Sequence, residues 1–273
     1  MSKSNDLNTY SVSKERLAYL KARKVRKVSI TLTQILILIV FIAQWEILAR
    51  LKVIDPFITS QPSRIINTIV NLYNEGQLFG HITVTCWETI VGFLSGTILG
   101  TIIAVILWWS EFLSKVLEPY LVILNSLPKI ALGPIFIVWF GAGTTSIIVI
   151  ALAISLIVTI LEVLNGFVAT DEEQIKLVKT FGANRLQVFT KVVFPSNLTV
   201  IINSLKINVG LSWVGVIVGE FLVSKSGLGY LIVYGGQVFQ LDLVMTSVII
   251  LCIAAGLMYK AVVLLQKLLI KKT

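Results

Sequence analysis

The chain has 273 residues, of which 56% are hydrophobic and 14% are charged, and its formal net charge is +9. Both fractions lie far from those of soluble domains, and the length of the apolar runs excludes a large soluble core as their explanation. A net charge this basic would suggest a nucleic-acid partner in a soluble chain, but beside apolar runs it indicates a lipid bilayer instead.

A basic segment opens the chain over residues 1–28, and apolar segments follow. A run of ~18 or more apolar residues with few charges predicts a transmembrane helix. We expect about six such helices, over residues 29–49, 85–109, 117–140, 145–168, 198–223 and 241–265. The predicted fold class is therefore all-α, a polytopic membrane protein. Its transmembrane domain covers residues 29–268, with a core at about 85–265, and leaves no room for a second globular domain.

Lys and Arg are distributed unevenly between the two sides of these spans. Eight precede the first span, three follow the last, and five lie in loops on the same side as the termini. Only Lys52, Arg64 and Lys225 clearly fall on the other side, a ratio of 16 to 3. Because basic residues favour the cytoplasmic side, we expect both termini in the cytoplasm.

The outer loop after the first span contains a predicted amphipathic helix. Pro62 can open it, Ile65, Ile69 and Tyr73 recur at helical spacing, and Gly76 ends it. At ~12 residues it is too short to cross a bilayer. The only histidine, His81, lies just after it and is expected to be solvated. Since the sequence has no metal-binding or catalytic motif, we expect no metal, no catalytic residue and no enzyme activity in this chain.

The second span carries Gly92, Gly96 and Gly100, two overlapping GxxxG steps on one helix face. Glycines at this spacing allow close approach of a neighbouring helix backbone. The pattern predicts helix packing, within one subunit or between two.

The third span is interrupted by Pro119, Pro128 and Pro134, with Lys129 near its middle. Prolines bend a membrane helix, and a lysine at that depth usually faces protein or water. We expect a kinked helix lining a polar pathway, although Lys129 could instead snorkel to the surface. Lys129, and Lys206 in the fifth span, could also pack against a buried carboxylate such as Glu162 or Glu220. The candidate pathway residues are Asn125, Lys129, Lys206, Asn208, Trp213 and Glu220.

A polar, basic loop over residues 169–197 separates the fourth and fifth spans. It is predicted to form a helix over 171–180, a turn at Gly182 and a second helix over about 184–194. An amphipathic element without a domain to pack on needs either a partner protein or the inner lipid surface.

This loop resembles the coupling loop of permease subunits of bacterial ABC importers. That family has Glu-Ala-Ala, three residues, Gly, nine residues and then an apolar run ending in Pro. Here Gly182 and the run from Val192 to Pro195 match in register, whereas residues 176–178 read Lys-Leu-Val. Residues 55–260 are also similar to the nitrate/sulfonate/taurine type of permease, as in "ALGPIFIVWFGAG" and "GEFLVSKSGLGYLI". At Glu88 that group often has arginine.

The resemblance implies a type I ABC importer permease fold in the bacterial cytoplasmic membrane, working by alternating access. It implies contact with an ATP-binding subunit through Lys176, Leu177, Val178, Gly182, Ala183, Arg185 and Pro195. It also implies a permease homodimer and an extracytoplasmic solute-binding protein. No cofactor is expected in this chain: without G-x-x-x-x-G-K-[ST], ATP and Mg would be bound by the partner subunit.

The expected solute is a sulfonate, taurine, nitrate or a similar organic anion. The same resemblance leaves open a thiamine precursor or another aromatic nutrient. An ion-driven secondary transporter is a remote alternative, because no internal repeat is found. A channel would lack a docking loop, and an intramembrane enzyme would need clustered catalytic side chains.

Overall fold

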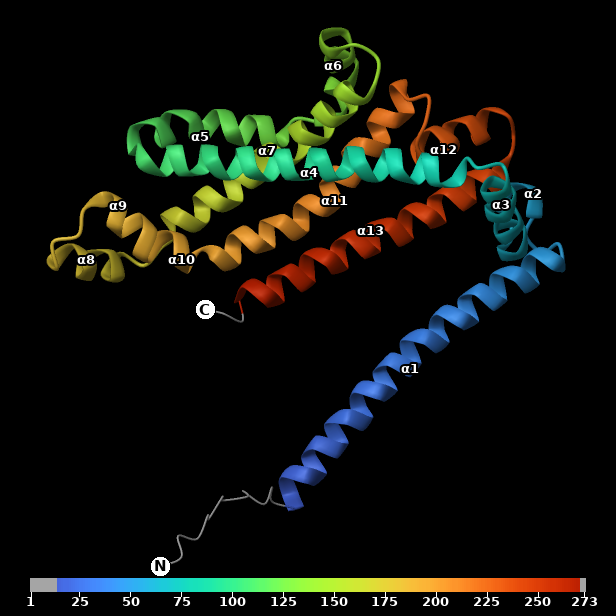
Figure 1. The fold of residues 1–273 in the computed structure, drawn as a ribbon, viewed down its shortest axis with the longest axis horizontal. Coiled ribbons are helices and arrows are strands. Elements are labelled where there is room, and N and C mark those ends of the chain that lie inside the picture. The colour runs from blue at the N-terminus through green and yellow to red at the C-terminus, as the bar shows by residue number, and fades with distance from the viewer. Residues whose placement is uncertain (1–13, 271–273) are drawn as a thin grey trace, which may run out of the picture. The chain divides into compact units, whose positions relative to one another are not determined.

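The computed structural model describes residues 14–270, which form helices and contain no strand (Figure 1). The chain divides into two compact units, Met1–Ser63 and Arg64–Thr273. Within the described residues, five helices are long and apolar enough to cross a membrane, and there are six if the bent pair Glu111–Ser126 and Lys129–Phe140 counts as one span. The prediction of an all-α polytopic membrane protein is therefore confirmed.

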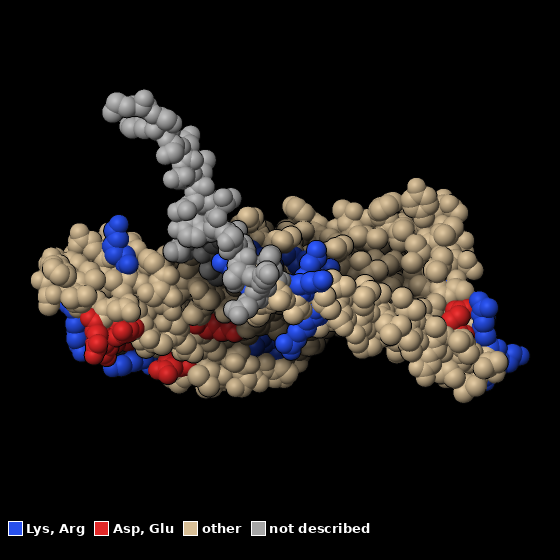
Figure 2. Space-filling model, turned by 90° about the horizontal axis from the view of Figure 1, so that it is seen from below, with Lys and Arg blue, Asp and Glu red and all other residues tan. Residues whose placement is uncertain are grey.

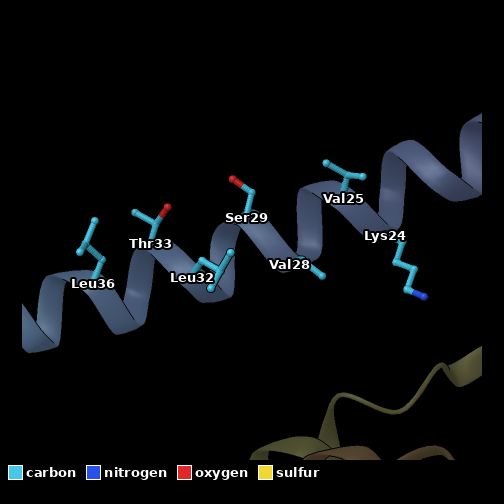
Figure 3. Close-up of a pocket in the computed structure, with 7 residues that line it drawn as sticks. All are labelled: Lys24, Val25, Val28, Ser29, Leu32, Thr33 and Leu36. Carbon is cyan, nitrogen blue, oxygen red and sulfur yellow. The ribbon is translucent and has the colours of Figure 1, made fainter.

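The first unit consists mainly of helix α1 (Lys14–Arg50) and the short helix α2 (Pro56–Thr59). Helix α1 begins well before the predicted span of 29–49, because Lys, Arg and Leu all favour helix and continue it through the basic segment. Its side chains are mostly exposed. Figure 3 shows the side chains that line an open pocket on the surface of α1: Lys24, Val25, Val28, Ser29, Leu32, Thr33 and Leu36.

The end of α1 is tied to the start of α3 (Pro62–Asn74) through Glu46. Its carboxylate accepts hydrogen bonds from Ser63 N at 3.1 Å and Ser63 Oγ at 3.0 Å, and it pairs with Arg50 at 2.7 Å. Helix α3 matches the amphipathic helix predicted from Pro62, and Gly76 beyond it has a positive φ of 73°.

The second unit is built on α4 (Leu78–Trp109), α7 (Thr144–Val168) and α11 (Leu198–Val223), with α7 packed against both others. The GxxxG face of α4 meets α7: a Cβ at Gly100 would lie 2.6 Å from the Thr159 Cβ. On the other side of α7, a Cβ at Gly215 of α11 would lie 2.6 Å from the Ala151 Cα. The α4 glycines therefore serve packing within the subunit, one of the two predicted alternatives.

The third span is broken into α5 (Glu111–Ser126), a 3₁₀ turn (Lys129–Leu132) and α6 (Gly133–Phe140), with a bend of 89°. The break falls at Leu127 and Pro128, because the residue before a proline disfavours helix and the proline has no N–H. Helix α6 projects from the other helices in Figure 1. The predicted kink is confirmed.

Helices α8 (Glu172–Thr180), α9 (Arg185–Val188) and α10 (Phe194–Ser196), with the π-helical turn Phe189–Val193, connect α7 to α11. Helix α12 (Leu228–Gln237) follows α11 and packs on α13 (Leu241–Ile270). Helices α8 to α10 and helix α12 lie at opposite ends of α11, and α13 runs alongside α11 (Figure 1). Most of the surface in Figure 2 carries no charged group, as expected for a protein that faces lipid.

Candidate functional site

The loop between α7 and α11 forms a helix–turn–helix whose ends are capped by its own side chains. The Asp171 carboxylate accepts from Glu173 N at 2.8 Å and so caps α8. Asn184 and Gln187 form a reciprocal capping box at the start of α9. Between the two helices, Gly182 has a φ of 81°, and its N–H bonds to the Lys179 carbonyl at 2.9 Å. The predicted left-handed turn at Gly182 is confirmed.

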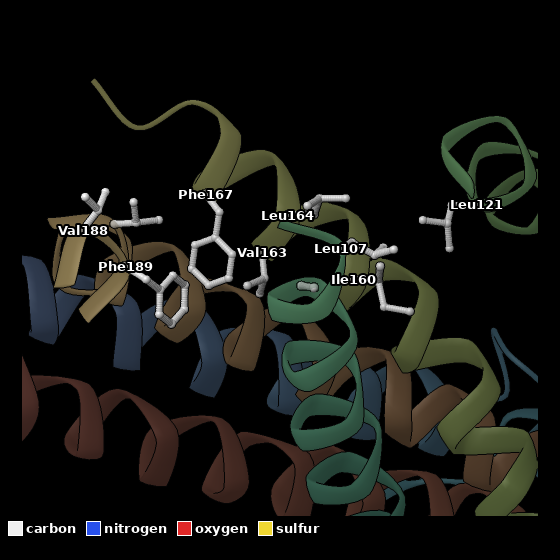
Figure 4. Packing of buried hydrophobic residues seen from close by; sticks show 10 residues of the cluster. Leu107, Leu121, Ile160, Val163, Leu164, Phe167, Val188 and Phe189 are labelled. Atoms are coloured by element: carbon white, nitrogen blue, oxygen red, sulfur yellow. The ribbon is translucent and has the colours of Figure 1, made fainter. Parts of the chain in front are cut away.

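The second half of this loop is anchored in a buried apolar cluster at the ends of α4 and α7. Figure 4 shows Val188 and Phe189 beside Phe167 and Val163 of α7, with Leu107 of α4 in the same cluster. The Phe189 ring lies 5.5 Å from the Phe167 ring and 4.9 Å from the Trp108 ring, between centroids. Since these side chains are buried together, the second half of the loop is packed tightly against the ends of α4 and α7.

Arg185 adds a polar contact between the loop and the end of α4. Its guanidinium lies over the rings of Trp108 and Trp109, 5.5 and 5.8 Å from their centroids. It also donates to the Trp108 carbonyl at 3.3 Å. A guanidinium suits this place because it can stack on aromatic rings and is attracted to helix C-terminal carbonyls.

On both sides of the turn, the loop leaves large apolar side chains uncovered in the single chain. Leu177 is 58% exposed, Phe181 82% and Leu186 57%. Exposed apolar side chains of this size on a short, rigid element are typical of protein–protein contacts. Phe181 was not among the predicted residues, because the family pattern has no fixed residue there.

The predicted coupling residues all lie on this element but differ in accessibility. Gly182, Arg185 and Pro195 are exposed, as are Lys176 and Leu177. Val178 and Ala183 are half-buried against the rest of the loop. Lys176 donates to Glu172 at 2.9 Å, which lowers the pKa of the Glu172 carboxyl below its usual range. A cavity of about 770 Å³, lined by α4, α5, α7 and the loop, lies beside them.

The candidate pathway residues do not form one group. Lys129 donates to the Asn125 carbonyl at 3.1 Å and to its side-chain oxygen at 3.3 Å, and both residues remain partly accessible. Lys206 is half-buried and donates to Asn203 Oδ1 at 3.2 Å. Within the described residues neither lysine forms an ion pair.

The other three candidates are buried inside the subunit. Asn208 donates to Thr159 at 2.5 Å and to Thr97 at 3.1 Å, joining α11 to both α7 and α4. Trp213 packs in an apolar cluster with Phe93 of α4, and its Nε1 has no hydrogen-bond partner in the described part of the chain. Glu220 is 1% exposed. In this structure the three contact neighbouring helices rather than an open space, and a role in the pathway stays a prediction.

The expectation of a solvated His81 is wrong. His81 lies in the first turn of α4, is half-buried, and its Nδ1 accepts a hydrogen bond from Gly227 N at 2.9 Å. The spacing of His81, Thr85 and Glu88 could have indicated this, since residues four and three apart share one helix face. That face packs on the loop before α12, where Thr85 Oγ1 accepts from Leu228 N at 2.7 Å.

Residues 96–273 match a protein family described as the binding-protein-dependent transport system inner membrane component. The putative aliphatic sulfonates transport permease protein SsuC of Bacillus subtilis is 29% identical, over 85% of this chain and 84% of its own. The formylaminopyrimidine transport permease protein ThiX of Halalkalibacterium halodurans is 30% identical, over 68% and 74%.

Among solved structures, the MetNI methionine ABC transporter in inward-facing conformations is similar in fold. The TM-score is 0.54 and the sequence identity is 20%, over 69% of this chain and 97% of that one. At this identity the similarity concerns the fold alone, and it agrees with the predicted type I importer permease fold.

Proposed function

This chain belongs to the family of binding-protein-dependent transport inner membrane components and is a membrane permease; we propose that it moves a small organic anion of the sulfonate type. The capped loop over residues 169–197 carries the proposal, because it combines a buried anchor with an uncovered apolar face. A permease without a partner would have no use for that face, whereas an importer driven by a separate ATPase needs one.

We propose that an ATP-binding subunit covers Leu177, Phe181 and Leu186. ATP and Mg would be bound there, since this sequence lacks the phosphate-binding G-x-x-x-x-G-K-[ST] loop. Movement of that subunit would be transmitted through Arg185 and Phe189 to the ends of α4 and α7, because both side chains contact those helices. Nucleotide binding can shift the permease between its inward-facing and outward-facing states only if the position of the docked loop differs between these two states.

The proposed solute class rests on charge and on the named relatives. Lys129 and Lys206 are partly accessible and have no ion pair among the described residues. Two such cations favour an anion over a neutral or cationic solute. A sulfonate fits the similarity to the Bacillus subtilis permease; a pyrimidine-type nutrient is the second candidate, favoured by the similarity to the formylaminopyrimidine permease.

We further propose that two copies of this chain form the pathway and that an extracytoplasmic binding protein delivers the solute. Both termini would lie in the cytoplasm, and the protein would reside in the bacterial cytoplasmic membrane. The charge asymmetry of 16 to 3 supports this orientation, since it places the loop at 169–197 on the side where ATP is available.

Reconstitution of the chain with its ATPase subunit and its binding protein in nanodiscs tests the proposal. We expect an aliphatic sulfonate to stimulate ATP hydrolysis only when all three components are present. Lys129→Gln and Lys206→Gln should reduce sulfonate transport while leaving assembly of the complex unchanged. Stimulation of ATP hydrolysis by a formylaminopyrimidine but not by a sulfonate would favour the second candidate. ATP hydrolysis by this chain alone would refute the assignment of that activity to a separate subunit.

A further inference from the structure

A cavity of about 770 Å³ lies at the end of the membrane domain that carries the loop over residues 169–197. Its walls come from the end of α4, the first part of α5, the end of α7 and helices α8 and α9. In Figure 4, Leu121 of α5 stands apart from Leu107 of α4 and Leu164 of α7, although all three side chains line the cavity. The cavity therefore lies between the first half of the broken span and the helices on which the loop is anchored.

Much of the wall of this cavity is apolar, and part of that apolar surface is uncovered. Leu107, Leu164 and Phe167 are 1%, 6% and 1% exposed and belong to the buried cluster that anchors the loop. Val122 of α5 and Val168 of α7 line the cavity too, but they are 52% and 68% exposed. Acyl chains are as apolar as these side chains and cover them favourably. The cavity can therefore take up part of an acyl chain.

The charged residues around the cavity begin at the depth of lipid headgroups. Helix α4 ends in Trp108 and Trp109, and tryptophan is enriched at the interfaces between membrane and water. Glu111 follows as the first residue of α5, and Lys115 lies one turn later. Helix α8, with Lys179 in its last turn, belongs to the polar loop at the same end of the domain. The cavity thus combines an apolar wall with a charged rim, at the depth where a phospholipid changes from acyl chain to headgroup.

The charged side chains that line the cavity include three of each sign: Glu111, Glu118 and Glu172, and Lys115, Lys179 and Arg185. Lys115 donates to Glu111 at 2.7 Å, and Glu172 accepts from Lys176 at 2.9 Å. Arg185 stacks on the rings at the end of α4. Glu118 of α5 and Lys179 of α8 form no ion pair among the described residues. A carboxylate and an ammonium group from different helices favour a ligand with both charges, because a purely anionic headgroup would also approach Glu118.

We propose that this cavity binds one phospholipid whose headgroup carries a phosphate and a primary ammonium group, as in phosphatidylethanolamine. The phosphate accepts from Lys179, the ammonium group donates to Glu118, and the adjoining part of the acyl chains covers Val122 and Val168. A volume of about 770 Å³ is within the usual range of small-ligand sites, about 300–1,000 Å³, so the rest of the lipid stays in the bilayer. The bound lipid joins α5 to α8 and so stabilises the position of the loop relative to the broken span.

Photo-crosslinking of the purified permease in nanodiscs, with and without its ATPase subunit, tests the site. The nanodiscs consist of phosphatidylcholine with a trace of phosphatidylethanolamine that carries a diazirine on its acyl chain close to the headgroup. Labelling of residues 111–122 in α5 is compared with labelling of residues 257–265 in α13, where Leu257, Leu264 and Leu265 are exposed. We expect an excess at α5 that unlabelled phosphatidylethanolamine removes and phosphatidylglycerol does not. No excess over α13, or equal competition by phosphatidylglycerol, would overturn the proposal.

Lys179→Gln and Glu118→Gln each remove one headgroup contact. Each should lower the excess labelling by roughly 3- to 5-fold, as expected for one exposed ionic contact, and Glu118→Gln should also let phosphatidylglycerol compete. Lys191→Gln and Glu173→Gln are matched controls that should keep the excess, because these exposed side chains lie on the same loop but do not line the cavity.

Three results contradict the lipid site. An unchanged excess in both cavity variants would show that the headgroup does not bind there. Loss of the excess when the ATPase subunit binds would show that this subunit covers the cavity. Loss of the excess on addition of a sulfonate would assign the cavity to the transport pathway.

Discussion

Replacement of Gly182 separates the conformation of the loop from its contacts. Gly182 has a φ of 81°, and a Cβ built on it would meet no heavy atom within 4 Å. A side chain here therefore causes backbone strain alone, with no steric clash. A non-glycine residue in the left-handed region costs ~1–2 kcal/mol, and a β-branched one lies at the upper end or above. Gly182→Val should thus lower the equilibrium constant for the correctly turned loop by roughly 30-fold or more.

The assay measures co-purification of the ATPase subunit and solute uptake in membranes with equal amounts of permease. We expect Gly182→Ala to weaken both, and Gly182→Val to weaken them further, with normal membrane insertion. Gly76→Ala is a matched control, since Gly76 has a φ of 73° and equally open surroundings but lies before α4, away from the loop. Wild-type uptake by Gly182→Val with the ATPase still bound would show that the turn does not carry the coupling.

Three further predictions concern packing, the loop anchor and orientation. Gly100→Val should destabilise the permease by about 1–3 kcal/mol in detergent unfolding, because a Cβ at this position would lie 2.6 Å from the Thr159 Cβ. Gly80→Ala should not destabilise it, because a Cβ at Gly80 would meet no heavy atom within 4 Å. Arg185→Lys should cost ~0.5–1 kcal/mol of loop stability through lost stacking, seen as faster hydrogen exchange at 171–197 with an unchanged net charge. Single cysteines at residues 225 and 272, in a variant without Cys86 and Cys252, should be labelled only from outside and only from inside, respectively; the reverse at either site contradicts the orientation.

Much of the fold could be predicted because a bilayer demands long apolar helices. Helices α7 and α11 begin at Thr144 and Leu198, against expected starts at 145 and 198. The turn at Gly182 and the break near Pro128 also follow from local sequence, since backbone conformation and missing donors act over a few residues. The true start of α1 could not be predicted, because hydropathy marks the membrane crossing and not the end of a helix.

The buried polar contacts could not be predicted, because they depend on which helices become neighbours. Glu220 accepts a hydrogen bond from Thr85 of α4, which lies 135 residues away along the chain, and nothing local marks the two as partners. His81 was interpreted from its place in a polar segment, whereas its hydrogen bond to Gly227 depends on the docking of α12. Spacing on one helix face identifies such residues as a group but does not identify what they face.

The same close packing bears on the proposal that the loop passes movement on to the membrane domain. Helix α7 meets glycines on both sides: Gly92 of α4 and Gly215 of α11 both lie against Ala151, and Asn208 bonds across to α7 and α4. Small residues leave little room for sliding, so the three helices form one tightly packed body. The loop continues directly from α7 into α11 and is anchored by Phe189 on α7. A force applied at Leu177 and Phe181 would therefore displace α4, α7 and α11 together, and a hinge would have to lie outside them, with the broken helix at Pro128 the best-placed candidate.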